Sequence, residues 1–243
     1  MAFDLKYKYY GANGILVEWP QRIDESILKD ILAFKSKLKN NKAVGTKNLH
    51  HGYASLLITY QNSNFNFSSE VNILKQVYNT SDISKKDKSV MWKIPVCYDV
   101  SFGIDLEQIS KEKQISIQDI VTLHSKPTYT IFFIGFLPGF LYLGGLDKVL
   151  FTPRKATPRL AIEKGALGIG GAQTGIYPTS SPGGWHIIGN CPINFFDISK
   201  PKPCFARAGD SLKFYPISLK EFHNIKTLVN AGVYQIESEV LND

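Results

Sequence analysis

The sequence lacks any long apolar run. No stretch approaches the roughly 20 consecutive apolar residues that a helix needs to cross a bilayer. The first residues, Met1 to Lys6, also lack the basic segment followed by a longer apolar one that marks a secretory signal. We therefore expect a chain that works in the cytoplasm and does not enter a membrane.

Cysteine is scarce as well. The chain of 243 residues has three, Cys97, Cys191 and Cys204, and none of them belongs to a Cys-x-x-Cys pair. An odd number of widely spaced thiols argues against a disulfide framework and against a zinc site. His50 and His51 stand side by side without a third ligand nearby in the sequence, so we expect no metal site there either.

Acidic residues are fewer than basic ones, with 21 Asp and Glu against 28 Lys and Arg, which gives a net charge of +7. Clustered basic side chains would suit binding to the phosphates of a nucleic acid. Much of the excess, however, is lysine between Lys29 and Lys47, on a predicted helix and its exit loop, and in the run 85–88. Because no nucleic-acid motif accompanies these lysines, we interpret them as solvated surface and expect no nucleic-acid partner.

Common catalytic and nucleotide-binding motifs are missing too. No Gly-x-Ser-x-Gly nucleophile elbow occurs, and Asp147 and Asp197 are the acidic residues close to the main glycine clusters, so paired carboxylates are absent there. The cluster 168–171, followed by Gly175, lacks the Gly-Lys-Ser/Thr ending of a P-loop and does not match the dinucleotide fingerprint. It is either an anion-binding nest or a tight turn between strands. The chain therefore lacks a self-contained catalytic apparatus, which favours a subunit whose chemistry another chain completes.

The first part of the chain alternates strands and helices. Gly14 to Trp19 predicts an apolar strand, and Asp24 can cap a helix whose apolar residues recur at three- and four-residue spacing. Tyr53 to Tyr60 predicts another strand, and a second helix starts at Ser68 or Ser69. We expect a small α+β unit of the split-βαβ kind. The apolar helix positions are Ile27, Ile31, Phe34 and Leu38 in the first helix and Val71, Leu74, Val77 and Tyr78 in the second.

A polar stretch, residues 79–89, follows this unit and contains almost no apolar side chain. Such composition is typical of a linker between domains. We therefore place the domain boundary here, with residues 1–88 forming one domain and residues 89–243 the other.

The second part of the chain predicts short strands separated by Gly and Pro turns, as in a barrel or a sandwich. Helices are expected at 105–113 and 116–124, the latter opened by the capping pattern of Ser116 and Asp119, and Ser218 with Glu221 opens a late helix. The expected strands are 92–98, 129–134, 165–170, 185–189, 193–196 and 211–215.

Most of the glycines fall between residues 134 and 188. Glycine reaches positive φ without steric cost and proline fixes φ near −65°, so a segment rich in both prescribes its backbone path in detail. Aromatic and polar side chains between the turns then project from a rigid frame. This Gly-rich segment indicates a shaped binding surface.

Two arginines and two histidines in or near this segment are candidates for chemistry. Arg154 and Arg159 each follow a proline, and their fork-shaped donors suit a carboxylate or a phosphate, with structural ion pairing as the equal alternative. His124, at a predicted helix end, is a candidate proton carrier, although a histidine there also serves as a helix C-cap partner. His186, beside Trp185, is a weaker candidate of the same kind.

A series of motifs follows one another along the chain: Gly-Phe-Leu-Pro-Gly-Phe at 135–140, Gly-Gly-Leu at 144–146, Pro-Arg at 153–154 and 158–159, Gln-Thr-Gly-Ile-Tyr-Pro at 173–178 and Ser-Pro-Gly-Gly-Trp at 181–185. Together they resemble the signature of the KipI/PxpB family, also called allophanate hydrolase subunit 1. Ile-Pro-Val-Cys-Tyr at 94–98 and Leu123-His124 extend the resemblance upstream, and Ala-Gly-Asp at 208–210 extends it downstream. It covers nearly the whole chain.

The resemblance implies a ferredoxin-like α+β domain at 1–88 and a cyclophilin-like β-barrel domain at 89–243 that carries the Gly-rich signature. It further implies the B subunit of an ATP-dependent 5-oxoprolinase, which converts 5-oxo-L-proline, ATP and water to L-glutamate. The implied partners are of two kinds, a PxpA-type A subunit together with a KipA/PxpC-type C subunit. ATP with Mg²⁺ would be bound mainly by these partners, so the isolated chain would be a non-autonomous part of a lactam hydrolase.

In that role the chain supplies part of a composite site with the C-type subunit. We expect Arg154 and Arg159 to hold an anion and His124 to be the proton carrier. The polar groups expected on the surface are Gln173, Thr174 and Tyr177, and the interface residues expected beside them are Phe136, Pro138, Phe140 and Trp185.

Other functions fit the same resemblance. One is an inhibitor that binds a sporulation histidine kinase, another is a subunit related to urea carboxylase and allophanate hydrolase, and a third, prolyl isomerisation, rests on the barrel alone, which does not fix function. The sequence also departs from the family pattern at Leu141, at Glu163 and at Asn190-Cys191, where Arg-Thr is common. The last departure removes an arginine near the Gly-rich surface and would weaken anion binding.

Overall fold

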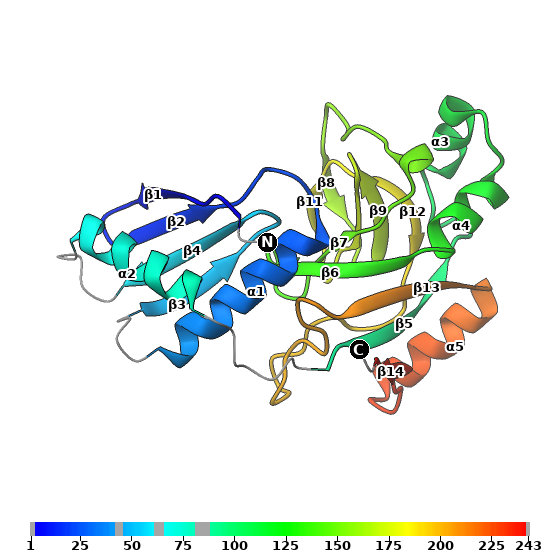
Figure 1. Ribbon diagram of the computed structural model, residues 1–243. Helices are drawn as coiled ribbons and strands as arrows, with labels where there is room; N and C mark the ends of the chain where they lie inside the picture. Colours follow the sequence, from blue (N-terminus) through cyan, green and yellow to red (C-terminus); the bar gives the residue numbers. More distant parts are fainter. Residues whose placement is uncertain (1–2, 42–45, 61–65, 81–87, 242–243) are drawn as a thin grey trace. The chain divides into compact units, whose positions relative to one another are not determined.

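The computed structural model describes residues 3–41, 46–60, 66–80 and 88–241 (Figure 1). The chain divides into two compact units, Met1–Asp87 and Lys88–Asp243, and each is described by itself. Most of the polar stretch expected as a linker, residues 81–87, lies outside the described residues, as do residues 42–45 of the lysine-rich loop. The linker therefore stays a prediction.

The described residues of the first unit form an antiparallel sheet with strand order β1-β2-β4-β3 and two helices. The strand from Gly14 and the helix after Asp24 are confirmed. The second helix begins at Phe67 and not at Ser68 or Ser69, because Asn66 is the N-cap and its side-chain oxygen accepts a hydrogen bond from Ser69 N at 3.0 Å. The elements are β1 Lys6–Tyr10, β2 Gly14–Glu18, α1 Glu25–Asn40, β3 Thr46–His51, β4 Ser55–Tyr60 and α2 Phe67–Asn79.

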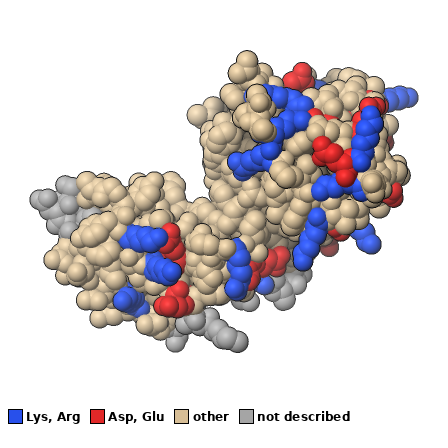
Figure 2. Space-filling view, turned by 90° about the horizontal axis from the view of Figure 1, so that it is seen from above, with Lys and Arg blue, Asp and Glu red and all other residues tan. Residues whose placement is uncertain are grey.

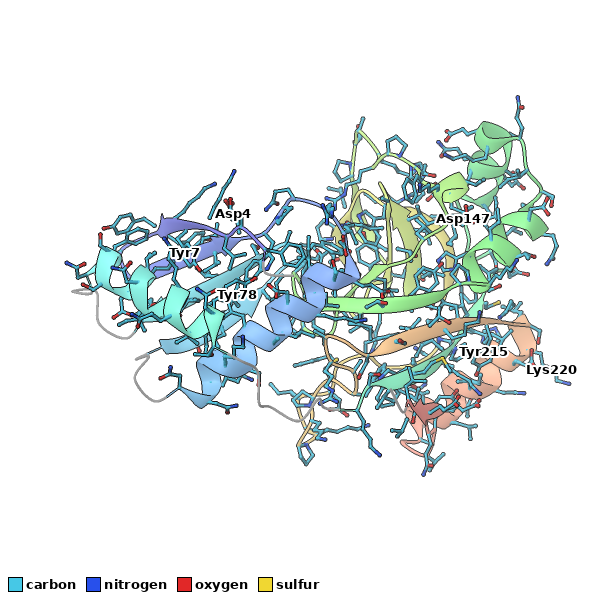
Figure 3. All side chains as sticks on the ribbon, in the orientation of Figure 1. Asp4, Tyr7, Tyr78, Asp147, Tyr215 and Lys220 are labelled. Atoms are coloured by element: carbon cyan, nitrogen blue, oxygen red, sulfur yellow. The ribbon has the colours of Figure 1, made fainter. Side chains whose placement is uncertain are left out.

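Both helices cover the same face of this sheet (Figure 1). The apolar positions predicted for α1 are buried and join residues of α2, β2 and β4 in one apolar cluster, which is how an amphipathic helix gains stability. Tyr78 of α2, labelled in Figure 3, donates its hydroxyl hydrogen to Asp30 Oδ2 of α1 at 2.6 Å. The same hydroxyl accepts a hydrogen bond from Phe3 N at 3.1 Å, so it ties the two helices to the start of the chain.

A larger sheet dominates the second unit and runs in the order β10-β9-β12-β5-β13-β6-β7, with β14 paired to β5. The end strands β10 and β7 pack against each other, so the sheet closes into a nearly complete barrel. β5 and β13 pair in parallel, and β8 pairs with β11 outside the barrel sheet. The strands are β5 Val90–Cys97, β6 Thr128–Ile134, β7 Leu141–Gly144, β8 Arg159–Ile162, β9 Ala166–Gly170, β10 Gln173–Ile176, β11 Ser181–Gly183, β12 His186–Asn190, β13 Ser211–Ile217 and β14 Ser238–Val240.

The barrel expected for the second part of the chain is confirmed, whereas the ferredoxin-like assignment of the first unit stays a prediction. Five of the six strands expected here are present. The strand expected at 193–196 is wrong: this segment is irregular, because Ile193 and Phe195 point into the core like alternate strand residues without joining a ladder. The short strands β7, β8, β10, β11 and β14 were not predicted, since Gly and Pro interrupt most of them or their surroundings.

Three helices and one short turn accompany the barrel: α3 Leu106–Lys113, α4 Ile117–Ser125, α5 Leu219–Asn230 and the 3-10 turn η1 Lys148–Leu150. The two predicted capping patterns are confirmed. Ser116 and Asp119 form a reciprocal capping box at the start of α4, and Ser218 and Glu221 form another at the start of α5. Each box satisfies backbone N–H groups that the helix itself leaves without a partner.

The surface carries both signs of charge. On the face drawn in Figure 2, basic side chains lie among acidic and uncharged ones in both units and do not form one continuous basic stripe. A protein that tracks a nucleic-acid backbone presents such a stripe. Within the described residues, no helix combines the length and the apolar character that a bilayer span requires.

Candidate functional site

The loop between η1 and β8 carries Arg154 and is fixed by backbone hydrogen bonds on both sides of it. Before Arg154, Thr152 and Gly171 form an isolated bridge in which Gly171 N donates to Thr152 O at 2.6 Å. After it, Lys155 N donates to Gly184 O at 2.7 Å. The loop is thus tied to the β9–β10 turn and to the segment that precedes β12. Arg154 is therefore presented from a fixed backbone.

Arg154 is exposed, and its guanidinium lies over the indole ring of Trp185 at 5.8 Å. Its Nη2 approaches Gln173 Oε1 at 3.5 Å, which is long for a hydrogen bond. Among the residues that the structure describes, Arg154 forms no ion pair. A guanidinium held over an aromatic ring and free of a carboxylate is available to an anionic ligand.

Two phenols flank this guanidinium. Burial raises the pKa of Tyr177 to about 12, and the positive charge of Arg154 acts in the opposite direction. Burial likewise raises the pKa of Tyr142, with Arg154 again opposing the shift. Both groups are therefore protonated at neutral pH. They cannot take protons from a substrate as bases.

Phe140, Tyr177 and Trp185 are buried instead of lying on the surface, which corrects the prediction made for them. Their rings meet nearly edge to face, with centroids 5.4 Å apart for Phe140 and Tyr177 and 5.5 Å apart for Phe140 and Trp185. Large aromatic side chains gain more free energy from this packing than from exposure to water. They form the floor beneath Arg154 and leave little of their own surface for a ligand.

Phe136 and Pro138 are exposed, as predicted, at the turn between β6 and β7. Phe136 is 69% exposed and has a φ of 65°, a left-handed conformation that a phenylalanine rarely adopts. Strained backbone of this kind clusters at functional sites. Phe195 and Phe196 pack on Gly139 of the same turn. Phe196 is 37% exposed, and Ile198, two residues further along the chain, is 84% exposed.

Arg159, expected beside Arg154 as an anion holder, is engaged within the chain. Its Nη2 donates to Asp105 Oδ1 at 2.7 Å and its Nη1 donates to Asp105 Oδ2 at 2.9 Å. Asp105 also accepts from Lys155 Nζ at 2.9 Å and from Ile187 N at 2.7 Å. Of the two alternatives weighed for Arg159, this geometry favours structural ion pairing over ligand binding.

Burial raises the pKa of Asp105, but the hydrogen bonds from Arg159, Ile187 N and Lys155 outweigh it and hold the pKa below its ordinary value. Sequence reasoning missed Asp105 as a site residue. It was expected at the start of a helix, and it is indeed the residue before α3, yet its side chain makes no capping hydrogen bond because the cations occupy it. No local pattern marks the difference.

His124 is fully buried and belongs to a chain of hydrogen bonds in the barrel core. Thr174 Oγ1 donates to Gly168 O at 2.9 Å, so His124 Nε2 carries the hydrogen that it shares with Thr174 Oγ1 at 2.8 Å. Tyr98 then donates its hydroxyl hydrogen to His124 Nδ1 at 2.8 Å. Burial lowers the pKa of His124 to about 3. This setting favours a structural role, and proton transfer by His124 stays an untested prediction.

Thr174 is fully buried in the same chain of hydrogen bonds, which corrects its predicted place on the surface. The strand alternation of β10 explains this placement, since Gln173 faces Arg154 and the next side chain must face the core. Gln173 is partly exposed, as predicted.

His186 lies in β12 and is 5% exposed. Its Nε2 donates to Pro153 O at 3.1 Å, because a carbonyl oxygen can only accept, while its buried Nδ1 has no partner among the described residues. Burial, together with the nearby charge of Lys155, lowers the pKa of His186, so the imidazole is neutral. It holds the backbone immediately before Arg154.

The glycine cluster 168–171 ends β9 and begins the tight turn to β10: Gly168 and Gly170 belong to the strand, and Gly171 N donates to Thr152 O, which favours the turn over an anion nest. A Cβ on Gly170 would lie 2.3 Å from Trp185 Cδ1, so the glycine is required because the indole packs directly on the backbone. Gly171 has a φ of 65° and turns the chain into β10. Within the described ranges, no group of three His, Cys, Asp or Glu side chains is arranged to hold a metal ion.

Comparisons with known proteins place the chain among carboxyltransferase-type domains. The chain is similar to the 5-oxoprolinase B subunit of Bacillus subtilis, with 45% identity over 134 residues, which is 55% of this chain and 56% of that protein. It is also similar to the 5-oxoprolinase B subunit of Haemophilus influenzae, with 50% identity over 122 residues, which is 50% of this chain and 57% of that protein. The matches thus span about half the length of these relatives.

A solved structure extends the likeness in fold. The urea amidolyase of Kluyveromyces lactis superimposes with a TM-score of 0.80 and 21% identity, covering 97% of this chain and 16% of that one. Residues 5–206 match the family described as carboxyltransferase domain, subdomain C and D. The chain therefore belongs to the carboxyltransferase domain, subdomain C and D, family, and its predicted membership of the KipI/PxpB family is confirmed.

Proposed function

We propose that the chain is the B subunit of an ATP-dependent 5-oxoprolinase, which converts 5-oxo-L-proline, ATP and water to L-glutamate, ADP and phosphate in the cytoplasm. The similarity to proteins named as B subunits of 5-oxoprolinase supports this substrate. The observation that carries the proposal is the free guanidinium of Arg154, held over Trp185 on a fixed loop. It supplies a binding group without supplying a nucleophile or a base.

The chemistry requires such a division of labour. A lactam is a poor electrophile, and transfer of a phosphoryl group to its oxygen makes ring opening accessible to water. Both the substrate carboxylate and a phosphoryl group are anions that a guanidinium binds through two parallel hydrogen bonds. Tyr142 and Tyr177, protonated beside Arg154, add no base to the site. The phosphoryl donor and the water are left to the partner subunits.

The fit of Mg²⁺ to this chain is poor. Octahedral magnesium prefers carboxylate and phosphate oxygens, and Asp105, a buried carboxylate near the site, is already neutralised by Arg159 and Lys155. The described residues hold no suitable cluster of ligands. We therefore assign the Mg²⁺ of the nucleotide to a KipA/PxpC-type C subunit or to a PxpA-type A subunit.

We further propose that the C-type subunit docks at the β6–β7 turn. Phe136, Pro138, Phe196 and Ile198 place exposed apolar surface there. Apolar groups of this size on a rigid turn act as anchors at protein interfaces. The site is then completed by residues of the partner, which explains why the chain shows no catalytic constellation around Arg154 in its described part.

The ferredoxin-like character of residues 1–88 and the boundary before residue 89 belong to the same proposal. The elements β2, α1, β3, β4 and α2 follow the order strand, helix, strand, strand, helix, and β1 takes the edge place beside β2. This order supports a ferredoxin-like unit whose edge strand comes from the start of the chain instead of its end.

Reconstitution tests the function. The chain is mixed with its A-type and C-type partners, and release of glutamate and ADP from 5-oxoproline and ATP is measured, with each component left out in turn. We expect coupled release only when all three are present. Binding to a histidine kinase without lactam opening would replace the proposal with the inhibitor function, and activity on urea instead would place the chain with the urea-degrading enzymes.

A further inference from the structure

The two residues that flank Arg154 are each held by a buried side chain from elsewhere in the barrel unit. Pro153 O accepts from His186 Nε2 at 3.1 Å, and Lys155 Nζ lies 2.9 Å from Asp105 Oδ1. His186 is 5% exposed and Asp105 is 3% exposed. Both side chains are therefore almost closed to a ligand from solvent. Each contacts the backbone or side chain next to the free guanidinium.

Asp105 and His186 are themselves joined through β12. Ile187, the residue after His186, donates its N–H to Asp105 Oδ2 at 2.7 Å, and Asp105 N donates to Ile187 O at 2.9 Å. Asp105 is thus bound to the strand that carries His186 by a reciprocal pair of hydrogen bonds. The two residues are therefore connected through the backbone of β12 by hydrogen bonds that burial shields from water.

We propose that Asp105 and His186 are positioning residues that hold Arg154 in the orientation needed to bind the anionic group of the substrate. A guanidinium binds a carboxylate or a phosphate well only when its two N–H bonds point along the lone pairs, so the aim of the side chain matters as much as its charge. The loop itself has no helix or strand to fix it at residues 153–158. The backbone hydrogen bonds of Thr152 and Lys155 hold the two ends of this turn, and His186 and Asp105 add side-chain contacts to the residues on either side of Arg154.

Lys155 and Arg159 share the single carboxylate of Asp105, so neither is free to compete with Arg154 for the ligand. The arrangement thereby leaves one cation, out of three within six residues of sequence, pointing outward. This explains why the two Pro-Arg motifs, alike in sequence, have different roles.

A matched pair of substitutions separates positioning from general stability. In His186→Gln the side-chain amide takes the place of Nε2 and can still donate to Pro153 O. In His186→Asn the amide is too short to reach that oxygen. Both variants remove the imidazole and differ by one methylene, which decides whether the side-chain amide reaches Pro153 O. Asp105→Asn removes the charge that neutralises Lys155 and Arg159.

The kinetic arm of the experiment rests on the proposed function and uses the complex with its partner subunits. We expect His186→Asn to raise KM for 5-oxoproline roughly tenfold while His186→Gln stays within about twofold of the wild type. In the background of Arg154→Ala, His186→Asn has no further effect on KM. The proposal would be overturned if His186→Asn raised KM by the same factor with and without Arg154→Ala. It would also be overturned if His186→Gln and His186→Asn had the same KM.

The spectroscopic arm depends on the structure alone. In the full-length isolated chain, the ¹⁵N relaxation of Arg154 Nε at mildly acidic pH reports how firmly the guanidinium is held. We expect its order to fall in His186→Asn and in Asp105→Asn and to be kept in His186→Gln. The proposed function fails if the wild-type complex has no activity on 5-oxoproline, or if Arg154→Ala leaves KM unchanged. The relaxation measurement still decides in that case whether His186 and Asp105 position Arg154. An Arg154 Nε as ordered in His186→Asn as in the wild type contradicts the positioning role.

Discussion

Arg159 donates two hydrogen bonds to the carboxylate of Asp105, from Nη2 to Oδ1 at 2.7 Å and from Nη1 to Oδ2 at 2.9 Å. Arg154, in the other Pro-Arg motif, has no carboxylate partner among the described residues and lies over Trp185. Arg159 therefore has a structural role, whereas Arg154 stays available to a ligand. The distinction gives the Gly-rich surface a single outward guanidinium over an aromatic floor.

Replacing Asp105 tests how much its ion pairs with Arg159 and Lys155 stabilise the fold. In Asp105→Asn we expect the free energy of unfolding at pH 7 to fall by about 2–3 kcal/mol, because two cations lose their counterion in a largely buried place. The pKa of Asp105 is lower in the folded chain than in the unfolded one, so its contribution is present above about pH 4 and is lost as the pH falls through the folded value. Urea denaturation at pH 7 and near pH 3 checks this. The difference in the free energy of unfolding between wild type and Asp105→Asn must be smaller near pH 3 than at pH 7. Glu107→Gln, at an exposed residue in the first turn of α3, is the control for a lost carboxylate.

His124 gives a prediction about protonation. Burial holds its pKa near 3, below the usual value of 6.5, so the unfolded chain binds this proton more readily than the folded chain. Its contribution to stability is complete above about pH 6.5 and declines as the pH falls toward the folded pKa. NMR of the imidazole carbons must show no titration of His124 between pH 5 and pH 8. A midpoint near pH 6.5 would show that the ring is open to water and would revive its role as a proton carrier.

Gly139 is required by two independent constraints. Its φ is 84°, and a Cβ there would lie 2.8 Å from Phe196 Cβ and 2.9 Å from Phe195 O. We expect Gly139→Ala to lower the free energy of unfolding by about 2–4 kcal/mol, the sum of backbone strain and overpacking. Gly232→Ala isolates the strain, since Gly232 has a φ of 72° and nothing within 4 Å of the added methyl group, and should cost about 1 kcal/mol. Thermal or chemical denaturation measures both, and equal losses would contradict the packing described for this turn.

We expect Phe136 to contribute to binding of the C-type subunit but not to the free energy of unfolding. Because the side chain is exposed and the φ is 65°, Phe136→Gly should leave the free energy of unfolding unchanged or raise it by up to about 1 kcal/mol. The same variant should weaken capture of the C-type subunit roughly tenfold or more, as loss of an aromatic anchor does. Val233→Gly, at a residue 62% exposed near the end of α5, is the control for loss of an exposed apolar side chain. Full partner binding by Phe136→Gly would remove this turn from the interface.

Much of the fold follows from local pattern. The apolar face of α1 and the two capping boxes depend on residues within a few positions of one another, and all of them are where the sequence predicts. The strand predicted at 193–196 is absent because alternation of apolar residues reports burial, while a strand also needs a neighbour for its backbone. Whether a neighbouring strand is in reach depends on the arrangement of the whole barrel.

The candidate site was predicted only in part, for a related reason. Arg154, Gln173 and Phe136 are at the surface, as expected, because the turns that present them are local. The partners that decide the role of Arg159 are distant: Asp105 lies 54 positions away in the chain and Ile187 lies 82 positions from Asp105. Pattern within a window cannot show such contacts. The same limit explains Tyr177 and Trp185, which were expected on the surface of the Gly-rich segment but whose rings complete the floor.

The most direct measurement of the central claim is the KM for 5-oxoproline of the reconstituted complex with Arg154→Ala, Arg154→Lys and, as a control in the first unit, Arg22→Ala. Loss of a charge-assisted pair with the substrate should raise KM at least roughly tenfold for alanine, with lysine between alanine and wild type and Arg22→Ala unchanged. Coupled release of glutamate and ADP with a KM that Arg154→Ala does not alter would contradict the assignment of Arg154 as the anion-binding group of this protein.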